Sequence, residues 1–208
     1  MKKEKEQCAH CKNGIGLKHV LYSDKIFWIV CDAHPLIEGH ILIIPKEHIS
    51  CMGALTKKDF EKYKELYAKV LLFLQKNYGN AGIFEHGRMG QTVFHAHTHF
   101  LPFNKSFEKI VPENNSVKTI FKIDELKTEF RNKGNYLFVA LNNQKWLVNI
   151  DIGYPEFFRA RFANLLNASE RGNWKKAEAN EKLMNILNCD IGQLKNKWAE
   201  YFNEKKFT

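Results

Sequence analysis

Three histidines at alternate positions, His95, His97 and His99, form the chemically richest stretch of the sequence. In an extended strand, side chains two residues apart project from the same face, so this spacing predicts a row of three imidazoles. Imidazole can act as a nucleophile, a proton donor or a metal ligand near neutral pH. Apolar residues flank the row, which favours a largely buried strand over a solvated one. We therefore expect a phosphate or a metal ion to bind beside it.

A pair of cysteines near the N-terminus, Cys8 and Cys11, forms a second group of candidate ligands. Two thiolates in a C-x-x-C arrangement can occupy two corners of a tetrahedral zinc site, which needs two more ligands. His10 lies between them and is a competing ligand. The alternative to a metal site is a flexible segment with two free thiols.

The composition limits the classes of protein to which the chain can belong. With 208 residues and 44% hydrophobic side chains, it can form one domain with a packed core, or such a domain with a substantial extension. Five cysteines, an odd count without a secretory signal, favour reduced thiols or a metal site over a disulfide framework. No stretch is long and apolar enough to span a membrane, so we expect a cytoplasmic protein.

The net charge of +9 is spread over both halves of the chain and forms no basic arm. The positive electrostatic field of such a charge favours binding of anionic small molecules. Nucleic-acid binding has no recognisable module to support it. Histidine is distributed differently, since all nine lie between His10 and His99. We therefore expect the chemistry to belong to the first half.

Regular elements that could position these side chains follow one another through the first half. Thr56 is the expected N-cap of a helix that extends to Tyr78, with apolar residues at helical spacing. A turn over residues 87–90 leads into the histidine strand. The pattern therefore predicts an α+β fold, an antiparallel sheet with a long helix across it. Apolar and β-branched residues place its earlier strands at residues 25–32, 40–44 and 81–85.

The histidine row and its flanks resemble the motif of the histidine-triad (HIT) superfamily of nucleotide hydrolases and transferases. The family pattern is His-x-His-x-His followed by two apolar residues, which residues 95–101 match throughout. Residues 91–93 resemble the family's Gly-Gln-Ser-Val segment, and residues 32–48 resemble its earlier strand pair. The resemblance covers about residues 15–104 and implies a HIT-like antiparallel sheet with a long helix packed on it. We therefore expect a HIT domain over residues 1–104, including the C-x-x-C segment.

The resemblance implies different catalytic roles for three of the histidines. His97 would attack the α-phosphorus of a nucleotide and form a nucleotidyl-imidazole, which water or another acceptor resolves. One ring nitrogen of His97 must then be unprotonated, with the other held by a backbone carbonyl, as in the family. His99 and His40 would donate hydrogen bonds to the phosphate oxygens as charge builds on them.

Three further residues match nucleotide-binding positions of the family. Asp32 would bind the ribose hydroxyls, although an Asp at a strand end is otherwise most often a turn residue. Gln91 and Thr92 would contact the phosphate or the leaving group. His34 and His86 are expected in loops near the cleft rather than as catalysts. The family often has an Asn in the loop before the triad, which this chain lacks, so recognition of the leaving group stays open.

The resemblance also implies how the C-x-x-C pair could complete a zinc site. In several HIT members, including the galactose-1-phosphate uridylyltransferase branch, the remaining ligands are the histidine after the Pro-Lys strand end and the first triad histidine. These positions are His48 and His95, so Cys8, Cys11, His48 and His95 would hold a structural zinc with no position open to water. No organic cofactor is implied. Those uridylyltransferases have Gln where this chain has His99, which favours the hydrolase branches and leaves transfer open.

Residues 105–208 form a carboxyl-terminal extension that a minimal HIT unit does not need. Residues 136–150 predict a β-hairpin that turns at Asn142 and Asn143, and residues 155–166 predict a helix. This α/β extension is either a degenerate second HIT-like half or an addition of another kind. Arg159 and Arg161 either reach substrate phosphates or are exposed helix arginines. A closing amphipathic helix is indicated by Ile191, Leu194, Trp198 and Phe202.

The expected function is that of a hydrolase that cleaves dinucleoside polyphosphates or nucleotidyl conjugates at the α-phosphorus through His97. A nucleotidyltransferase or phosphorylase would use the same intermediate. The alternatives are a zinc hydrolase whose triad binds a catalytic metal, a non-catalytic nucleotide sensor, and a DNA end-processing module related to aprataxin. Small HIT proteins often pair through the long helix and a sheet edge, so a homodimer is expected unless the extension occupies that surface.

Overall fold

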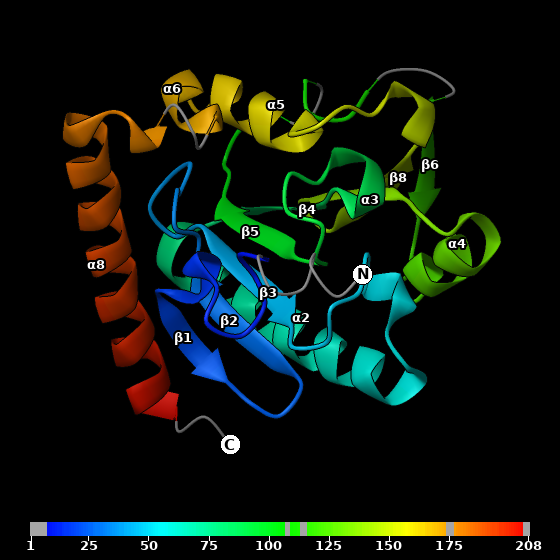
Figure 1. The fold of residues 1–208 in the computed structure, drawn as a ribbon, viewed down its shortest axis with the longest axis horizontal. Coiled ribbons are helices and arrows are strands. Elements are labelled where there is room, and N and C mark those ends of the chain that lie inside the picture. The colour runs from blue at the N-terminus through cyan, green and yellow to red at the C-terminus, as the bar shows by residue number, and fades with distance from the viewer. Residues whose placement is uncertain (1–7, 107–108, 113–115, 174–176, 206–208) are drawn as a thin grey trace.

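The computed structural model describes residues 8–106, 109–112, 116–173 and 177–205. Its framework is an eight-stranded sheet in the order β1-β2-β3-β5-β4-β7-β8-β6, with antiparallel pairing throughout (Figure 1). The expected α+β class and HIT-like antiparallel sheet are confirmed. The strands are β1 Val20–Ser23, β2 Phe27–Cys31, β3 Ile41–Pro45, β4 Ala81–Glu85, β5 Thr98–Pro102, β6 Val117–Ile120, β7 Leu137–Leu141 and β8 Gln144–Val148.

The long helix α2 (Lys57–Tyr78) packs on the sheet, as expected. The Thr56 hydroxyl caps it by accepting from the backbone N–H of Asp59, and the helix ends at Gly79, whose φ of 89° suits glycine. Its buried face is aromatic and aliphatic and contacts β5, where the hydroxyls of Tyr63 and Thr98 lie 2.9 Å apart. This contact fixes the strand that carries the third histidine of the row.

The histidine row departs from a regular strand. Only His99 lies within β5, because pairing with β3 is confined to Thr98–Phe100. Upstream, the N–H of His95 donates to the carbonyl of Val93, and the N–H of Ala96 donates to Ile49. The expectation of three imidazoles on one face of a strand is therefore wrong: the backbone turns ahead of β5, and His95 faces a different set of partners from His97.

The second half extends the same sheet through β7, which pairs with β4. The predicted hairpin is confirmed as β7 and β8, with Asn142 and Asn143 at positive φ in the turn. Strand β6 and helix α4 (Glu125–Lys133) were not expected from the sequence. The order strand–helix–strand–strand thus occurs twice, as β3-α2-β4-β5 and as β6-α4-β7-β8, and the sheet orders of the two units mirror each other about the β4–β7 pair.

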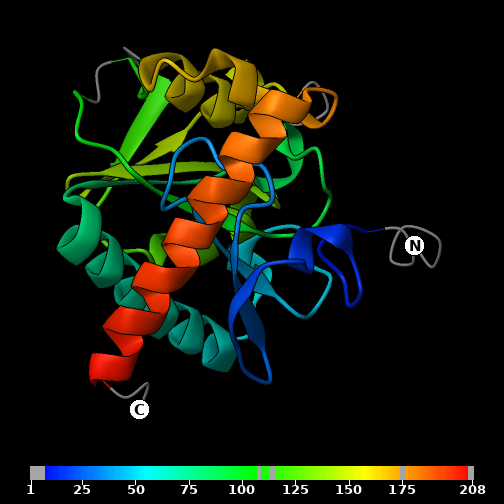
Figure 2. The same cartoon turned by 90° about the vertical axis from the view of Figure 1, so that its left-hand side faces the viewer.

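Two groups of helices from the second half of the chain cover the first half. Helix α8 (Glu181–Lys205) runs along one side of the molecule (Figure 2). It contacts α2 and β2, and the centroid of the Trp198 ring lies 4.9 Å from that of Phe73. Helices α5 (Phe157–Leu165) and α6 (Ser169–Gly172) lie across the sheet near β4, where Phe162 stacks on Phe84. Among the described helices, none could cross a membrane. The short 3-10 helices are η1 Ile15–Leu17, η2 Met52–Ala54 and η4 Ile150–Ile152, and α3 covers Gly87–Gly90.

Candidate functional site

A cavity lies over the second and third histidines of the row and is lined by both halves of the chain. The first half contributes the triad, the strand end after β2 and the N-terminal loop. The second half contributes α5 and the segment that precedes α8. The ionisable and polar side chains in its lining belong to His10, Asp32, His34, His86, Thr92, His97, His99, Glu156, Arg159 and Glu178.

His97 presents one ring nitrogen as a lone pair. Its Nδ1 lies 2.6 Å from the backbone carbonyl of His95, and a carbonyl can only accept, so Nδ1 carries the proton. In the neutral ring Nε2 is then unprotonated. Burial is the main cause of a lowered pKa of His97, which keeps the ring neutral near pH 7. The arrangement leaves an unprotonated ring nitrogen on a residue of the cavity wall.

His40 and His99 form a hydrogen-bonded chain that orients a donor toward the cavity. The N–H of Leu36 donates to Nδ1 of His40, so His40 carries its proton on Nε2. That Nε2 lies 2.9 Å from Nδ1 of His99, which accepts, so the proton of His99 lies on its Nε2, for which the described part of the chain offers no hydrogen-bond acceptor. His40 is fully buried, and burial lowers its pKa to about 4. His99 lines the cavity, whereas His40 lies behind it.

Asp32 ends the β2 segment as a buried carboxylate at the cavity. Its Oδ1 accepts from the N–H of His34 at 2.8 Å, and its Oδ2 lies 3.0 Å from Nη1 of Arg159. Burial is the largest single effect and raises the pKa of Asp32, but the positive charge of Arg159, the neighbouring His40 and the hydrogen bond from the N–H of His34 together outweigh it and hold the pKa at about 2. Asp32 is thus an anion at neutral pH.

Gln91 and Thr92 occupy different places. Thr92 lines the cavity. Gln91 is buried in the loop between α3 and β5. Its Nε2 donates to the carbonyl of Ser50 at 2.8 Å and lies 3.4 Å from that of His95. In this structure Gln91 therefore ties the loop to the segment after β3, while Thr92 is the one of the pair that a ligand would meet.

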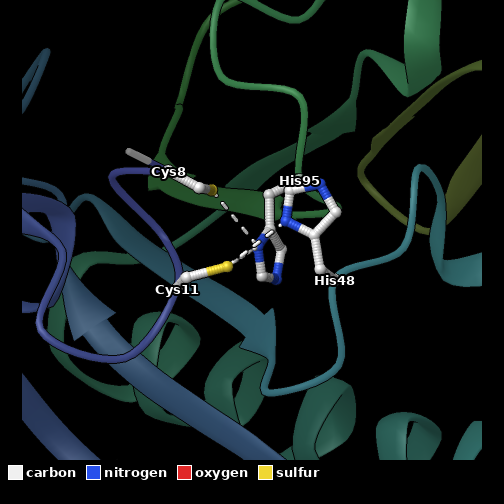
Figure 3. A group of neighbouring side chains, drawn as sticks. All are labelled: Cys8, Cys11, His48 and His95. Carbon is white, nitrogen blue, oxygen red and sulfur yellow. Dashed lines mark hydrogen bonds between the residues drawn. The ribbon is translucent and has the colours of Figure 1, made fainter. Parts of the chain in front are cut away.

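The two cysteines and two histidines expected for zinc come together in one group (Figure 3). The Sγ of Cys8 lies 3.5 Å and that of Cys11 3.6 Å from Nδ1 of His95, and the Sγ of Cys11 lies 3.2 Å from Nδ1 of His48. Tetrahedral zinc, with bonds of about 2.3 Å to sulfur and about 2.0 Å to nitrogen, needs S···N separations of about 3.5 Å.

The hydrogen bonding of His95 also suits a metal ligand. Its Nε2 lies 2.7 Å from the carbonyl of Pro45, so Nε2 carries the proton and the Nδ1 lone pair faces the cysteines. The donor set of two thiols and two imidazoles, with all ligand atoms within 4.8 Å of one another, fits tetrahedral zinc. These four residues could hold a metal ion.

The triad does not converge on a single ion. Asp32, His40 and His99 form a second group with ligand atoms within 4.8 Å of one another, but their nitrogens are engaged with each other and Arg159 places a positive charge beside Asp32. His97 belongs to neither group among the described residues. The arrangement therefore does not match a catalytic metal held by all three triad histidines.

His10 takes a place that the sequence did not indicate, whereas His86 lies where it was expected. His10 is absent from the cysteine–histidine group and instead packs edge-on against His97, with ring centroids 4.6 Å apart. Its Nδ1 is buried and has no hydrogen-bond partner among the residues that the structure describes. His86 lies between β4 and α3 and lines the cavity, as expected of a loop residue near the cleft; it is buried between Phe84 and Phe158 and accepts from the N–H of Phe158. No local spacing would have separated His10 from a zinc ligand.

The two arginines of α5 behave differently. Arg159 lines the cavity and is 6% exposed. Arg161 points away from it, with its guanidinium over the ring of Phe157 and a hydrogen bond to the carbonyl of Lys109. Of the two arginines named from the sequence, only Arg159 is therefore placed to meet a ligand.

An antiparallel sheet with a long helix, carrying a buried histidine row beside a cavity, defines a histidine-triad protein, and comparisons with known proteins agree. The HIT domain family model matches residues 17–106. An uncharacterized HIT-like protein of Borreliella burgdorferi is 31% identical over 103 residues, which cover 46% of this chain and 74% of the relative. The chain belongs to the HIT family.

Relatives with a stated activity are more distant. A bis(5'-adenosyl)-triphosphatase of Dictyostelium discoideum is 21% identical and covers 55% of this chain and 93% of its own length. An asymmetrical bis(5'-nucleosyl)-tetraphosphatase of Schizosaccharomyces pombe is 29% identical, and the match covers 42% of this chain and 50% of the relative's length. Among solved structures, a zinc-bound histidine triad protein of Mycobacterium smegmatis is 20% identical, covers 54% of this chain and 81% of its own, and has a TM-score of 0.37.

Proposed function

We propose that this protein hydrolyses nucleotides at the α-phosphorus through a covalent nucleotidyl-His97 intermediate. The observation that carries the proposal is the 2.6 Å contact between Nδ1 of His97 and the His95 carbonyl, which leaves Nε2 as a lone pair at the cavity. The Nε2–H of His99 is available beside it as a donor to a phosphate oxygen. Dinucleoside polyphosphates and nucleotidyl conjugates are the proposed substrates, and two relatives named for dinucleoside polyphosphates support the first of these.

The reaction proceeds in two displacements. Nε2 of His97 forms a bond to the α-phosphorus, and the bond from phosphorus to the leaving oxygen breaks, so that a polyphosphate leaves with the electron pair as an anion. Throughout this step the Nδ1 proton stays on the ring and donates to the His95 carbonyl, which stabilises the positive charge on the imidazole. Water then attacks phosphorus, the P–N bond breaks, the electron pair returns to Nε2, and one proton passes to solvent. A nucleoside monophosphate is released.

Binding roles follow from the cavity lining. Asp32 accepts hydrogen bonds from the ribose hydroxyls, and Thr92 contacts the phosphate or the leaving group. His40 acts through His99 by accepting from Leu36 and donating to Nδ1 of His99. Gln91 holds the loop that presents Thr92.

The cysteine–histidine group is a structural zinc site in this proposal. Cys8, Cys11, His48 and His95 supply four protein ligands, so no position stays open to activate water. The metal would tie the N-terminal loop to the segment before β5. Because His95 also supplies the carbonyl that holds His97, the zinc site and the nucleophile share one residue.

Residues 105–208 are, we propose, a degenerate second HIT-like half. The repeated strand–helix–strand–strand order and the central β4–β7 pair support this interpretation. The half lacks a histidine row, and its contribution to the cavity is made by α5 and by the segment before α8.

The site of bond cleavage tests the proposal directly. With diadenosine tetraphosphate in water labelled with heavy oxygen, attack at the α-phosphorus places the label in AMP and leaves ATP unlabelled. Label in ATP would place the attack at the neighbouring phosphorus and contradict the proposal. A His97→Asn variant, assayed in parallel, should release neither product.

A further inference from the structure

Arg159 belongs to the part of the chain outside the HIT match, yet it forms part of the cavity wall. The HIT domain match ends at residue 106, and Arg159 lies on α5 in the second half. Its guanidinium is buried against Asp32, a residue 127 positions earlier in the chain. A buried arginine at this distance in sequence is held by the fold, and its position is therefore defined before any ligand arrives.

The hydrogen bonds of Arg159 leave one N–H of its guanidinium unused within the described part of the chain. Nε donates to the carbonyl of Gly172 at 3.1 Å, Nη2 donates to the carbonyls of His34 and Arg171, and Nη1 donates to Oδ2 of Asp32 at 3.0 Å. A guanidinium carries five N–H bonds, two of them on Nη1. The second N–H of Nη1 has no acceptor within the described ranges of the chain, and it sits beside a carboxylate at the cavity.

Asp32 retains acceptor capacity next to that donor. Its two oxygens offer about four lone-pair sites. The N–H of His34 and Nη1 of Arg159 occupy two of them, and Nε2 of His40 lies 3.5 Å from Oδ2. A donor and an acceptor are thus presented side by side.

The charge of this pair indicates which group it receives. A phosphate oxygen could accept from Arg159 but would be repelled by the Asp32 carboxylate. A hydroxyl both donates and accepts, so it can give its proton to Asp32 and accept the spare N–H of Arg159. The pair therefore matches a sugar hydroxyl better than a phosphate.

We infer that Arg159 is a substrate-binding residue that selects nucleotides with an intact ribose, acting together with Asp32. The inference rests on the proposed function, because it takes the ligand to be a nucleotide. It assigns to the second half of the chain a direct part in ligand choice. Without Arg159, Asp32 would keep its charge but would lose the group that holds its carboxylate toward the ribose hydroxyl.

Binding of AMP and of its 2′,3′-dideoxy analogue, measured by calorimetry on the full chain, tests the inference. The wild type should bind AMP at least about tenfold more tightly, since a hydrogen bond to a charged group contributes this much or more. Arg159→Lys keeps a positive charge beside Asp32 but lacks the planar fork, and its preference should fall to about threefold or less. Arg161→Met, a change on the same helix away from the cavity, should keep the wild-type preference.

A second variant guards against failure to fold. Arg159→Gln retains a planar amide donor without the charge, and thermal melting identifies which variants are folded. An undiminished preference for AMP in either folded variant, or no preference in the wild type, overturns the role of Arg159 while leaving hydrolysis at His97 intact. Absence of any nucleotide binding by the wild type overturns both the inference and the proposed function.

Discussion

Nε2 of His40 lies 2.9 Å from Nδ1 of His99, and the N–H of Leu36 donates to the other nitrogen of His40. A backbone N–H thus determines, through two imidazoles, which nitrogen of His99 carries its proton toward the cavity. His40 has no exposed surface, so its effect on a ligand must pass through His99.

Replacement of His40 by Phe should lower kcat by about tenfold to 100-fold and change KM little. An aromatic ring is kept, but His99 loses the partner that fixes its tautomer, and removal of a transition-state donor costs about 100-fold or more. Steady-state kinetics on a dinucleoside polyphosphate provide the measurement. His19→Gln, a change outside the cavity lining, is the control. Equal loss in both variants, or a change in KM alone, would argue against the relay.

Loss of one ligand should empty the cysteine–histidine site. Cys11→Ser should copurify with little zinc and melt about 5 °C or more below the wild type, because the N-terminal loop loses its attachment to His48 and His95. Elemental analysis and thermal melting with and without a chelator provide the readout. The matched change Cys189→Ser, at an exposed cysteine, should alter neither. A wild type that binds no zinc would remove this part of the proposal.

Glu85 should make the protein less stable as the pH rises. Burial raises its pKa from 4.5 to about 7, against the opposing hydrogen bonds from Met52 and the Tyr136 hydroxyl. The folded state therefore binds the proton more tightly than the unfolded state. Its contribution is fully present below pH 4.5 and is lost as the pH rises to about 7, an effect of about 3 kcal/mol.

Glu85→Gln should remove this pH dependence and stabilise the protein at pH 8. Buried histidines with lowered pKa values, such as His40, give the opposite slope below pH 6.5, so the informative quantity is the difference between two variants. Urea unfolding of Glu85→Gln and of the exposed-site control Glu65→Gln, between pH 5 and 8, supplies it. Parallel stability curves for the two variants would show that Glu85 does not titrate in this range.

The chain should be a monomer in solution. The β4 edge of the first half is occupied by β7 of the same chain, and α8 covers part of α2, so the extension covers a sheet edge and part of the long helix through which a homodimer was expected. Sedimentation at micromolar concentration should give the mass of one chain. A dimer that persists on dilution would mean that another surface mediates assembly.

Local patterns were sufficient for the parts of the fold whose signals are short in sequence. The capping residue Thr56, the apolar face of α2 and the Asn142–Asn143 turn each determine structure through neighbours a few residues away. The cysteine–histidine group was also identified, although only the family resemblance connected Cys8 to His95.

The remainder depends on contacts between distant segments. Nothing near Arg159 distinguishes it from Arg161 in the sequence, since their difference arises from how α5 lies on the sheet next to Asp32. The edge contact of His10 with His97 has the same origin. Residues 117–120 are half exposed and carry little apolar periodicity, which explains why β6 was missed.

The central claim is that Nε2 of His97 becomes bonded to the α-phosphorus. Rapid mixing with radiolabelled diadenosine tetraphosphate, an alkaline quench that spares the P–N bond, and peptide mapping test it most directly. We predict an adenylyl group on the peptide that contains His97, formed and lost within one turnover and absent from His97→Asn. Turnover at a normal rate in His97→Asn, or a label on any other residue, would contradict the account.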